Sequence, residues 1–214
     1  MLIHPWDGAS DAEWRAWLSA GHDFGQLVAI DGECEPVIVP THFHFDGEST
    51  ILLHLARPNP IWPALEMRGE ATLSVLDDYA FIPSTWRAGE TRPAENGVPT
   101  SYYANVQLRC TATILDDPAA KAELLRAQLG HFQPAGDHGP VAVGEEPYHR
   151  LLSGIRGIRL TIVGARAKFK YDDRKPELQD EIAEKLNNRA SGRDVSAAAQ
   201  QLRRHNQPRR HHRD

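Results

Sequence analysis

The chain has 214 residues, of which 41% are hydrophobic, so it can bury the core of one domain with small appended elements. Its formal net charge of -5 argues against a polyanion such as nucleic acid as the main partner, because such binding rests first on neutralising phosphates. No apolar run approaches the roughly 18 residues of a membrane span, the first residues lack a signal-peptide pattern, and the two cysteines, Cys34 and Cys110, suit free thiols. We therefore expect a cytoplasmic protein with no membrane partner.

The N-terminal part predicts one short helix followed by several short strands. Ser10 and Glu13 have the spacing of a capping box, and Trp14, Trp17 and Leu18 then fall on one helical face. Asp-Gly pairs at 31–32 and 46–47 are hairpin signals between apolar runs. The predicted strands are 24–30, 36–45, 49–56, 71–76 and 79–82.

The rest of the chain mixes strands with helices. Asn59 followed by Pro60 predicts a helix start, with Asn59 as the N-cap, and Asp117 followed by Pro118 predicts another. A polar loop is expected over 87–97. The remaining predicted strands are 100–115, 157–163 and 166–171, and the remaining predicted helices are 117–132, 176–186 and 195–203.

Closely spaced strands with hairpin turns, interrupted by a few helices, favour an α+β fold that is mainly β, built on an antiparallel barrel. Neither G-x-G-x-x-G nor G-x-x-x-x-G-K-[ST] occurs, so a doubly wound nucleotide-binding sheet is not indicated. We predict a barrel domain over 1–175, helices packed on it over 176–202, and a basic, disordered tail over 203–214.

His54 lies in the middle of an apolar strand and shares one face with Leu52 and Ala56. It is either a core histidine satisfied by a backbone carbonyl or a ligand or catalytic group. Arg57 follows directly and either forms a surface ion pair or holds a phosphate or carboxylate near the predicted helix start.

Other polar residues leave two interpretations open. His42 and His44 share a strand face, which suits either a solvated surface or a shared metal ion. The hydroxyls of Ser84 and Thr85 can bind phosphate or close a turn. Lys168 and Lys170 alternate with Phe169, as solvated lysines on an edge strand also do.

The order of four short motifs resembles a known family. H-L-A-R-x-N-P begins at His54, x-P-S-x-W ends at Trp86, V-P-T ends at Thr100, and K-F-K begins at Lys168. Together they resemble the PaiB-like branch of the FMN-binding split-barrel proteins, over almost the whole chain. The resemblance implies a split barrel related to pyridoxamine-phosphate oxidases, a homodimer with a cofactor pocket at its interface, and Arg57, Ser84 and Thr100 as anchors for an FMN phosphate.

One departure from the family pattern changes the expected cofactor pocket. After V-P-T the family continues W-N-Y, whereas this chain has Ser101, Tyr102 and Tyr103, which reshape the pocket wall where a flavin would sit. The chain also resembles a divergent group of the same family, the haem-dependent piperazate synthases, which close N5-hydroxy-L-ornithine into L-piperazic acid by forming an N–N bond. The resemblance implies haem b as the cofactor and His54 as its iron ligand. Further cofactor-binding residues are then Arg57, Asn59, Ser84, Trp86 and Thr100.

The reaction implied by this resemblance needs proton transfer and a folded substrate. The catalytic candidates are Lys168, Lys170, Tyr102 and Tyr103. Arg87 and Arg109 are candidates for holding the α-carboxylate of the amino-acid substrate. Two other interpretations compete: an FMN-dependent oxidoreductase, and a flavin-binding negative transcriptional regulator, whose local support is the basic segment 203–214.

Overall fold

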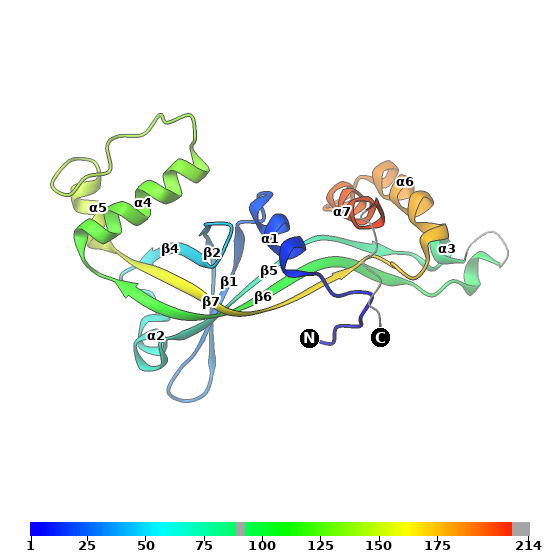
Figure 1. Ribbon diagram of the computed structural model, residues 1–214, viewed down its shortest axis with the longest axis horizontal. Helices are drawn as coiled ribbons and strands as arrows, with labels where there is room; N and C mark the ends of the chain where they lie inside the picture. Colours follow the sequence, from blue (N-terminus) through cyan, green and yellow to red (C-terminus); the bar gives the residue numbers. More distant parts are fainter. Residues whose placement is uncertain (89–92, 207–214) are drawn as a thin grey trace. The chain divides into compact units, whose positions relative to one another are not determined.

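The computed structural model describes residues 1–88 and 93–206, and within them seven strands form one sheet in the order β2-β1-β5-β6-β7-β4-β3 (Figure 1). Strand β1 pairs antiparallel with β2 and β5, and β4 pairs antiparallel with β3 and β7. The strands are β1 (Phe24–Ile30), β2 (Pro36–His42), β3 (His44–Phe45), β4 (Thr50–Ala56), β5 (Glu70–Ile82), β6 (Thr100–Leu115) and β7 (Ile155–Lys170). The prediction of a mainly β, antiparallel α+β fold is confirmed.

Helices come before, between and after these strands along the chain (Figure 1). They are α1 (Asp11–Ser19), α2 (Trp62–Arg68), α3 (Ser84–Arg87), α4 (Pro118–Phe132), α5 (Tyr148–Gly154), α6 (Gln179–Arg189) and α7 (Asp194–Asn206). Short 3-10 turns lie at η1 (Ala94–Asn96) and η2 (Pro176–Leu178).

The chain forms two compact units made of interleaved segments. The central unit comprises Asp11–Val75 and Val106–Arg166. The terminal unit comprises Met1–Ser10, Leu76–Asn105 and the described residues from Ala167 onward. Strands β5, β6 and β7 each contribute residues to both units, so neither unit is a continuous stretch of sequence.

Local sequence signals explain where several elements begin. In α1, the predicted apolar face of Trp14, Trp17 and Leu18 is buried. The carboxylate of Asp46 accepts hydrogen bonds from three backbone amides of the turn that leads into β4, at 2.8 to 3.0 Å. Asp117 caps α4, because its side chain accepts from the Ala120 amide at 2.9 Å.

Some predicted boundaries were wrong. Helix α2 begins at Trp62 rather than at Pro60, and its N-cap is Ile61 rather than Asn59. The two strands predicted at 71–76 and 79–82 are one strand, β5, and the two predicted at 157–163 and 166–171 are one strand, β7. Helix α5 was not predicted.

Only the first part of the predicted basic tail, residues 203–206, is described by the structure. Residues 203–206 belong to α7, where Arg204 donates to the Asp173 carboxylate at 2.7 Å and to the Gly8 carbonyl at 3.3 Å. These residues are therefore helical rather than disordered. Residues 207–214 lie outside the described residues.

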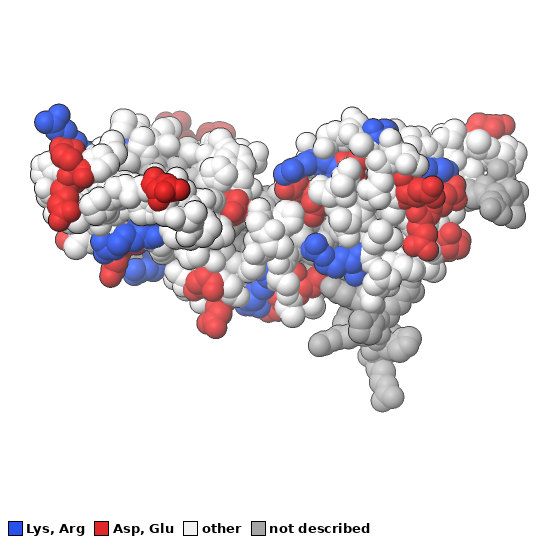
Figure 2. Space-filling view, turned by 90° about the horizontal axis from the view of Figure 1, so that it is seen from above, with Lys and Arg blue, Asp and Glu red and all other residues white. Residues whose placement is uncertain are grey.

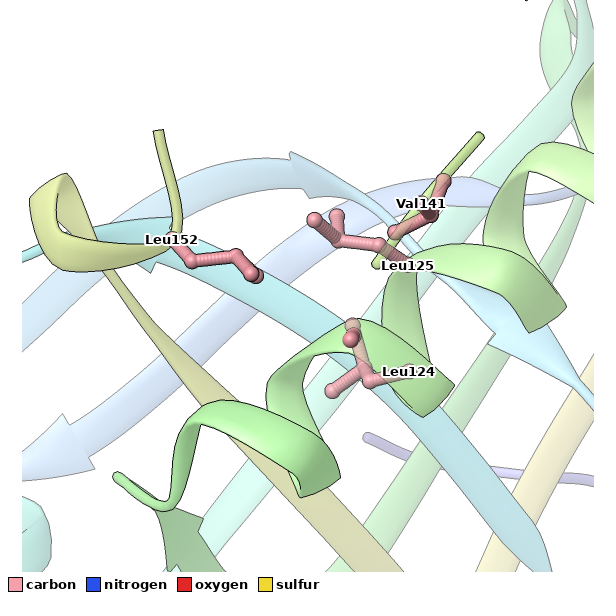
Figure 3. Close-up of a cluster of buried hydrophobic side chains, with 5 residues drawn as sticks. Leu124, Leu125, Val141 and Leu152 are labelled. Carbon is pink, nitrogen blue, oxygen red and sulfur yellow. The ribbon is translucent and has the colours of Figure 1, made fainter. Parts of the chain in front are cut away.

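The central unit has a hydrophobic cluster beneath α4 and α5. Figure 3 shows Leu125 of α4 beside Val141, with Leu152 of α5 reaching toward them. Leu124 and Ala122 complete the buried set, and Leu52 of β4 packs against it. Burial of this cluster fixes α4 over the strand that carries His54.

None of the described helices combines the length and the apolar character needed to cross a membrane. On the face shown in Figure 2, Lys and Arg side chains lie interspersed with Asp and Glu side chains. Cys34 is exposed and Cys110 is buried, and both are free thiols, as predicted.

Candidate functional site

His54 lies on β4, and its ring contacts a side chain of α4. The His54 Nδ1 atom is 2.6 Å from Oε1 of Gln128, which is a buried residue. The Gln128 amide is oriented by its Nε2 group, which donates to the Leu52 carbonyl at 3.4 Å. Because an amide oxygen only accepts hydrogen bonds, Nδ1 carries a hydrogen, and in the neutral ring Nε2 keeps its lone pair. Nε2 is the atom left to bind a metal.

The surroundings of His54 are apolar, and a glycine brings α4 close to them. Gly157 of β7 is the register partner of His54. A Cβ atom at position 157 would lie 2.9 Å from Leu124 Cδ1 and 3.2 Å from Leu115 Cβ. Only glycine fits at this distance without a shift of its neighbours, and its absent side chain lets α4 pack closely on the sheet.

Arg57 lies just after β4 and is held against α5. Its Nε donates to the Ser153 carbonyl at 2.9 Å, and its backbone amide donates to the Gly154 carbonyl at 2.8 Å. Asn59 closes the turn before α2, because its side-chain oxygen accepts from the Ile61 amide at 3.1 Å. The Asn59 side chain therefore stabilises the backbone of this turn, and Asn59 is not the N-cap of α2.

A second group of predicted residues lies in the terminal unit. The Lys170 ammonium donates to Thr100 Oγ1 at 2.6 Å and to the Ser101 carbonyl at 3.1 Å. Burial lowers the pKa of Lys170, and the positive charges of Lys168 and Arg87 lower it further, although Asp172 acts in the opposite direction. This lysine gives up its proton more readily than an exposed lysine does.

Tyr102 follows Thr100 by two residues on β6 and is fully buried in the core of the terminal unit. Its hydroxyl donates to Asp172 Oδ2 at 3.2 Å. The same carboxylate receives two hydrogen bonds from Arg87, at 2.8 and 3.0 Å. Burial raises the pKa of Tyr102 far above its usual value, and the negative charge of Asp172 adds to this effect. The phenol thus stays protonated, which favours a structural role over that of a base.

Lys168 lies near the Tyr103 ring and contacts the N-terminal segment. Lys168 is buried, its ammonium lies 3.5 Å from the Asp7 carboxylate, and it donates to the Leu2 carbonyl at 2.9 Å. Its Nζ atom is 5.8 Å from the centre of the Tyr103 ring. Lys168 is not a solvated lysine, and its contacts anchor the N-terminal segment.

Ser84 and Trp86 belong to α3, a single turn in the terminal unit. A Cβ atom at Gly97 would lie 1.8 Å from the Ser84 carbonyl oxygen, so the chain passes very close to this turn. The Arg189 guanidinium lies 4.7 Å from the centre of the Trp86 ring. Trp86 is therefore covered by α6 on one face.

The predicted cofactor and catalytic residues thus fall into two groups. His54, Arg57 and Asn59 belong to the central unit. Lys170, Thr100 and Tyr102 lie close together in the terminal unit, which also holds Lys168, Tyr103, Ser84 and Trp86. Arg57, Ser84 and Thr100 were expected to hold one phosphate. Arg57 belongs to the central unit, whereas Ser84 and Thr100 belong to the terminal unit.

The two arginines considered for a substrate carboxylate differ in their surroundings. Arg87 is already engaged by both oxygens of Asp172 and by the Val98 carbonyl. Arg109 lies exposed on β6. A role as a substrate clamp remains a prediction for both.

His42 and His44 lie on different strands, because the predicted strand 36–45 is interrupted at Phe43. The His44 ring lies 5.1 Å from the ring of His131, and burial lowers the pKa of His44. His42 is exposed. Within the described residues, neither histidine belongs to a set of three ligating side chains close enough to hold one ion.

Sequence reasoning missed Gln128 and Asp172. Gln128 follows Leu124 by four residues and Leu125 by three, so it is a polar residue on the apolar face of α4. That signal could have marked it as a partner for a buried polar group. Asp172 has a positive φ of 56° at the end of β7, which no sequence pattern indicated.

Comparison with models of protein families places the chain in one of them. The family model described as "Putative FMN-binding domain" matches residues 2–163. The chain belongs to this family. The expected membership of the FMN-binding split-barrel proteins is confirmed, whereas a search of curated proteins found no match.

Solved structures share the fold at low sequence identity. The flavocytochrome Anf3 from Azotobacter vinelandii has a TM-score of 0.58 and 20% identity, covering 77% of this chain and 70% of that chain. The FAD and haem binding protein from Mycobacterium smegmatis has a TM-score of 0.57 and 18% identity, covering 75% and 71%. A "putative 5-nitroimidazole antibiotic resistance protein" from Bacteroides thetaiotaomicron VPI-5482 has a TM-score of 0.56 and 12% identity, covering 75% and 85%. These likenesses support the split-barrel fold.

Proposed function

We propose that this member of the FMN-binding family binds haem b through His54 and converts N5-hydroxy-L-ornithine into L-piperazic acid. The observation that carries the haem assignment is the hydrogen bond between His54 Nδ1 and Gln128. Histidines that bind metals commonly donate their other ring N–H to an acceptor, which fixes the ring and raises its basicity. His54 has this arrangement, with Nε2 left for iron, and Leu52 of the same strand packs against the apolar cluster beneath α4.

Two structural relatives make a haem site on this fold reasonable. One is named a flavocytochrome and the other an FAD and haem binding protein. No C-x-x-C-H occurs in the chain, so the haem would be held without covalent attachment. Arg57, which follows β4 by one residue, is the candidate partner for a propionate.

The proposed reaction is an internal displacement with loss of water. The α-amine nitrogen forms a bond to N5, the N5–O bond breaks, and its electron pair leaves with the oxygen, which takes a proton. Bound ferric haem would supply a Lewis acid that makes hydroxide a better leaving group. Atoms and electrons balance without any external oxidant or reductant.

The protein must also accept the proton that the α-ammonium loses. Lys170 is the best candidate among the four predicted catalytic residues, because its pKa is lowered by burial and Thr100 orients its amine. Tyr102 holds its proton too firmly to serve as a base. Lys168 is engaged by Asp7.

The alternative is an FMN-dependent oxidoreductase. It is favoured by the family description and by the contact between Lys170 and Thr100, since an ammonium and a hydroxyl together can bind a phosphate. A nucleic-acid-binding regulator is less favoured. Its support was the basic segment, and Arg204 of that segment is bonded within the fold.

The deciding experiment compares cofactor and redox requirements. The purified protein should show the Soret band of haem, and His54→Ala should lose most of the bound haem while keeping its fold. Anaerobic ferric protein given N5-hydroxy-L-ornithine and no reductant should form a product lighter by one water. Flavin bands together with turnover only in the presence of NAD(P)H would replace this proposal with the oxidoreductase.

A further inference from the structure

A cavity of about 460 Å³ lies in the central unit between the end of β4, the start of α4 and α5. Its polar wall is formed by Arg57, Asp116, Lys121, His149 and Ser153. This volume is within the range of pockets that take small molecules. The charges on its wall decide what kind of molecule fits.

Lys121 carries a buried positive charge on this wall. The residue is only 3% exposed, and its ammonium donates to the backbone carbonyls of Leu152 and Ile155. An ammonium has three N–H donors, so one has no acceptor among the described residues. Within the same part of the chain, no carboxylate lies within ion-pair distance of Lys121. Burying a charge without a contacting counter-ion is unfavourable. An anion bound next to Lys121 would therefore stabilise its buried ammonium.

Arg57 adds a second cation with unused donors. Of the guanidinium nitrogens, only Nε makes a hydrogen bond to the described residues, to the Ser153 carbonyl. Its terminal nitrogen is 3.8 Å from Asp116, too far for a hydrogen bond. The planar terminal nitrogens of arginine suit the two oxygens of a carboxylate or phosphate.

Asp116 attracts both cations but makes its hydrogen bonds to Arg156. The Arg156 guanidinium donates to both Asp116 oxygens, at 2.8 and 2.6 Å, and donates to Glu66 at 2.6 Å as well. This bidentate pair satisfies the one carboxylate on the cavity wall. The lining of the cavity therefore carries two cations and one carboxylate, and both cations keep unused N–H donors.

We propose that this cavity binds the oxyanion group, a carboxylate or a phosphate, of a small molecule, with Lys121 and Arg57 as the direct contacts. The proposed site rests on the cavity and on Lys121, not on the assignment of His54 as an iron ligand. It shares Arg57 with the proposed function, which pairs that residue with a haem propionate. Its volume leaves room for a molecule larger than the oxyanion itself.

Binding is tested by calorimetric titration of the full-length protein with inorganic phosphate and, separately, with succinate, at constant ionic strength set by chloride. The two titrations distinguish a phosphate site from a carboxylate site. We expect saturable binding of at least one anion, and at least tenfold weaker binding in Lys121→Met and in Arg57→Gln. Arg159→Gln removes one positive charge from β7 in the same unit, outside the cavity wall, and should bind as the wild type does.

Thermal unfolding provides a second measurement of the same site. Lys121→Met should be at least as stable as the wild type without anion, because it removes a buried charge that no carboxylate contacts, and the bound anion should no longer raise its Tm. Equal anion binding by Lys121→Met and the wild type would overturn the proposal. So would wild-type protein that binds neither anion at constant ionic strength.

Discussion

Gln128 allows the surroundings of His54 to be changed without altering the imidazole. In Gln128→Leu the Nδ1–H group loses its acceptor, so the ring is no longer fixed and its basicity falls. Removing such a partner typically weakens metal binding by about 10- to 100-fold, and we expect a similar loss of haem affinity, measured by titration of the Soret band. Glu123→Gln, at an exposed position of α4, is the control and should bind haem normally. Unchanged affinity in Gln128→Leu would show that the hydrogen bond only stabilises the core.

Lys170 gives a prediction about pH. A lysine accepts a proton only in its neutral form, and the pKa of Lys170 is below its ordinary value of 10.5. The cyclisation rate should therefore rise with pH through the lowered pKa and level off before pH 10.5. Lys170→Arg keeps the charge but does not titrate in this range, so it should be slow at every pH. Lys185→Gln, which removes an exposed ion pair with Glu181, should keep the wild-type profile. A rising limb that persists in Lys170→Arg would assign the proton transfer to another group.

At the residue scale, the sequence was informative about His54 and uninformative about its partner. Alternation along β4 predicted a half-buried imidazole with apolar neighbours, and the structure has this arrangement. The core-histidine interpretation named a backbone carbonyl as the partner, whereas the partner is a side-chain amide 74 positions along the chain. Such long-range pairs depend on which helix packs over which strand, which periodicity does not specify.

At the element scale, the close packing of α4 on the sheet depends on Gly157. In Gly157→Ala the new methyl group would displace Leu124 and press on Leu115. Overpacking of this kind typically destabilises by about 1–3 kcal/mol, and we expect a value near the lower end because the Leu124 side chain can move. Urea unfolding measures this change, and haem titration should show weaker binding, since Gln128 moves with α4. Gly154→Ala, where a Cβ meets nothing within 4 Å, should change neither. Equal stability of the two variants would mean that the helix packs loosely here.

The elements that were predicted wrongly have two physical causes. Asp77 and Asp78 disfavour a strand by propensity, which suggested a break between residues 76 and 79. Tertiary contacts override this preference, because Asp77 is paired with Arg193 at 2.6 Å and the Asp78 carbonyl accepts from Tyr171 at 2.8 Å. Helix α5 has seven residues, too few for a clear apolar period.

At the scale of the whole molecule, the predicted homodimer can be tested on β5. Three of its residues in the terminal unit expose apolar side chains: Leu76 is 58% exposed, Tyr79 is 52% and Phe81 is 59%. Exposed apolar groups of this kind mark contacts with other molecules when they are contiguous. If a second copy covers them, Phe81→Glu should convert a dimer to a monomer in light scattering after gel filtration. Glu70→Gln, at the other end of β5, should leave the mass unchanged. A wild-type monomer at micromolar concentration would exclude this arrangement.

The overall architecture was predictable because many independent signals agreed on it. Hairpin turns, alternating strands and two well-capped helices each pointed to an antiparallel α+β fold. The composition of the two compact units was not predictable, because each gathers segments that are distant in the sequence. The proposed division at residue 175 remains a prediction.

The distance along the chain between His54 and Gln128 has a consequence for folding. Strands β5 and β6 come between β4 and α4 in the sequence. The hydrogen bond therefore closes a loop of 74 positions and can form only after both strands have been synthesised. Contacts of such long range form late and slow the folding of β-rich proteins. A ribosome-bound chain that ends before α4 therefore presents an imidazole without its acceptor. Cofactor uptake should consequently follow completion of the fold, and refolding mixtures should recover native circular dichroism before they recover the haem spectrum.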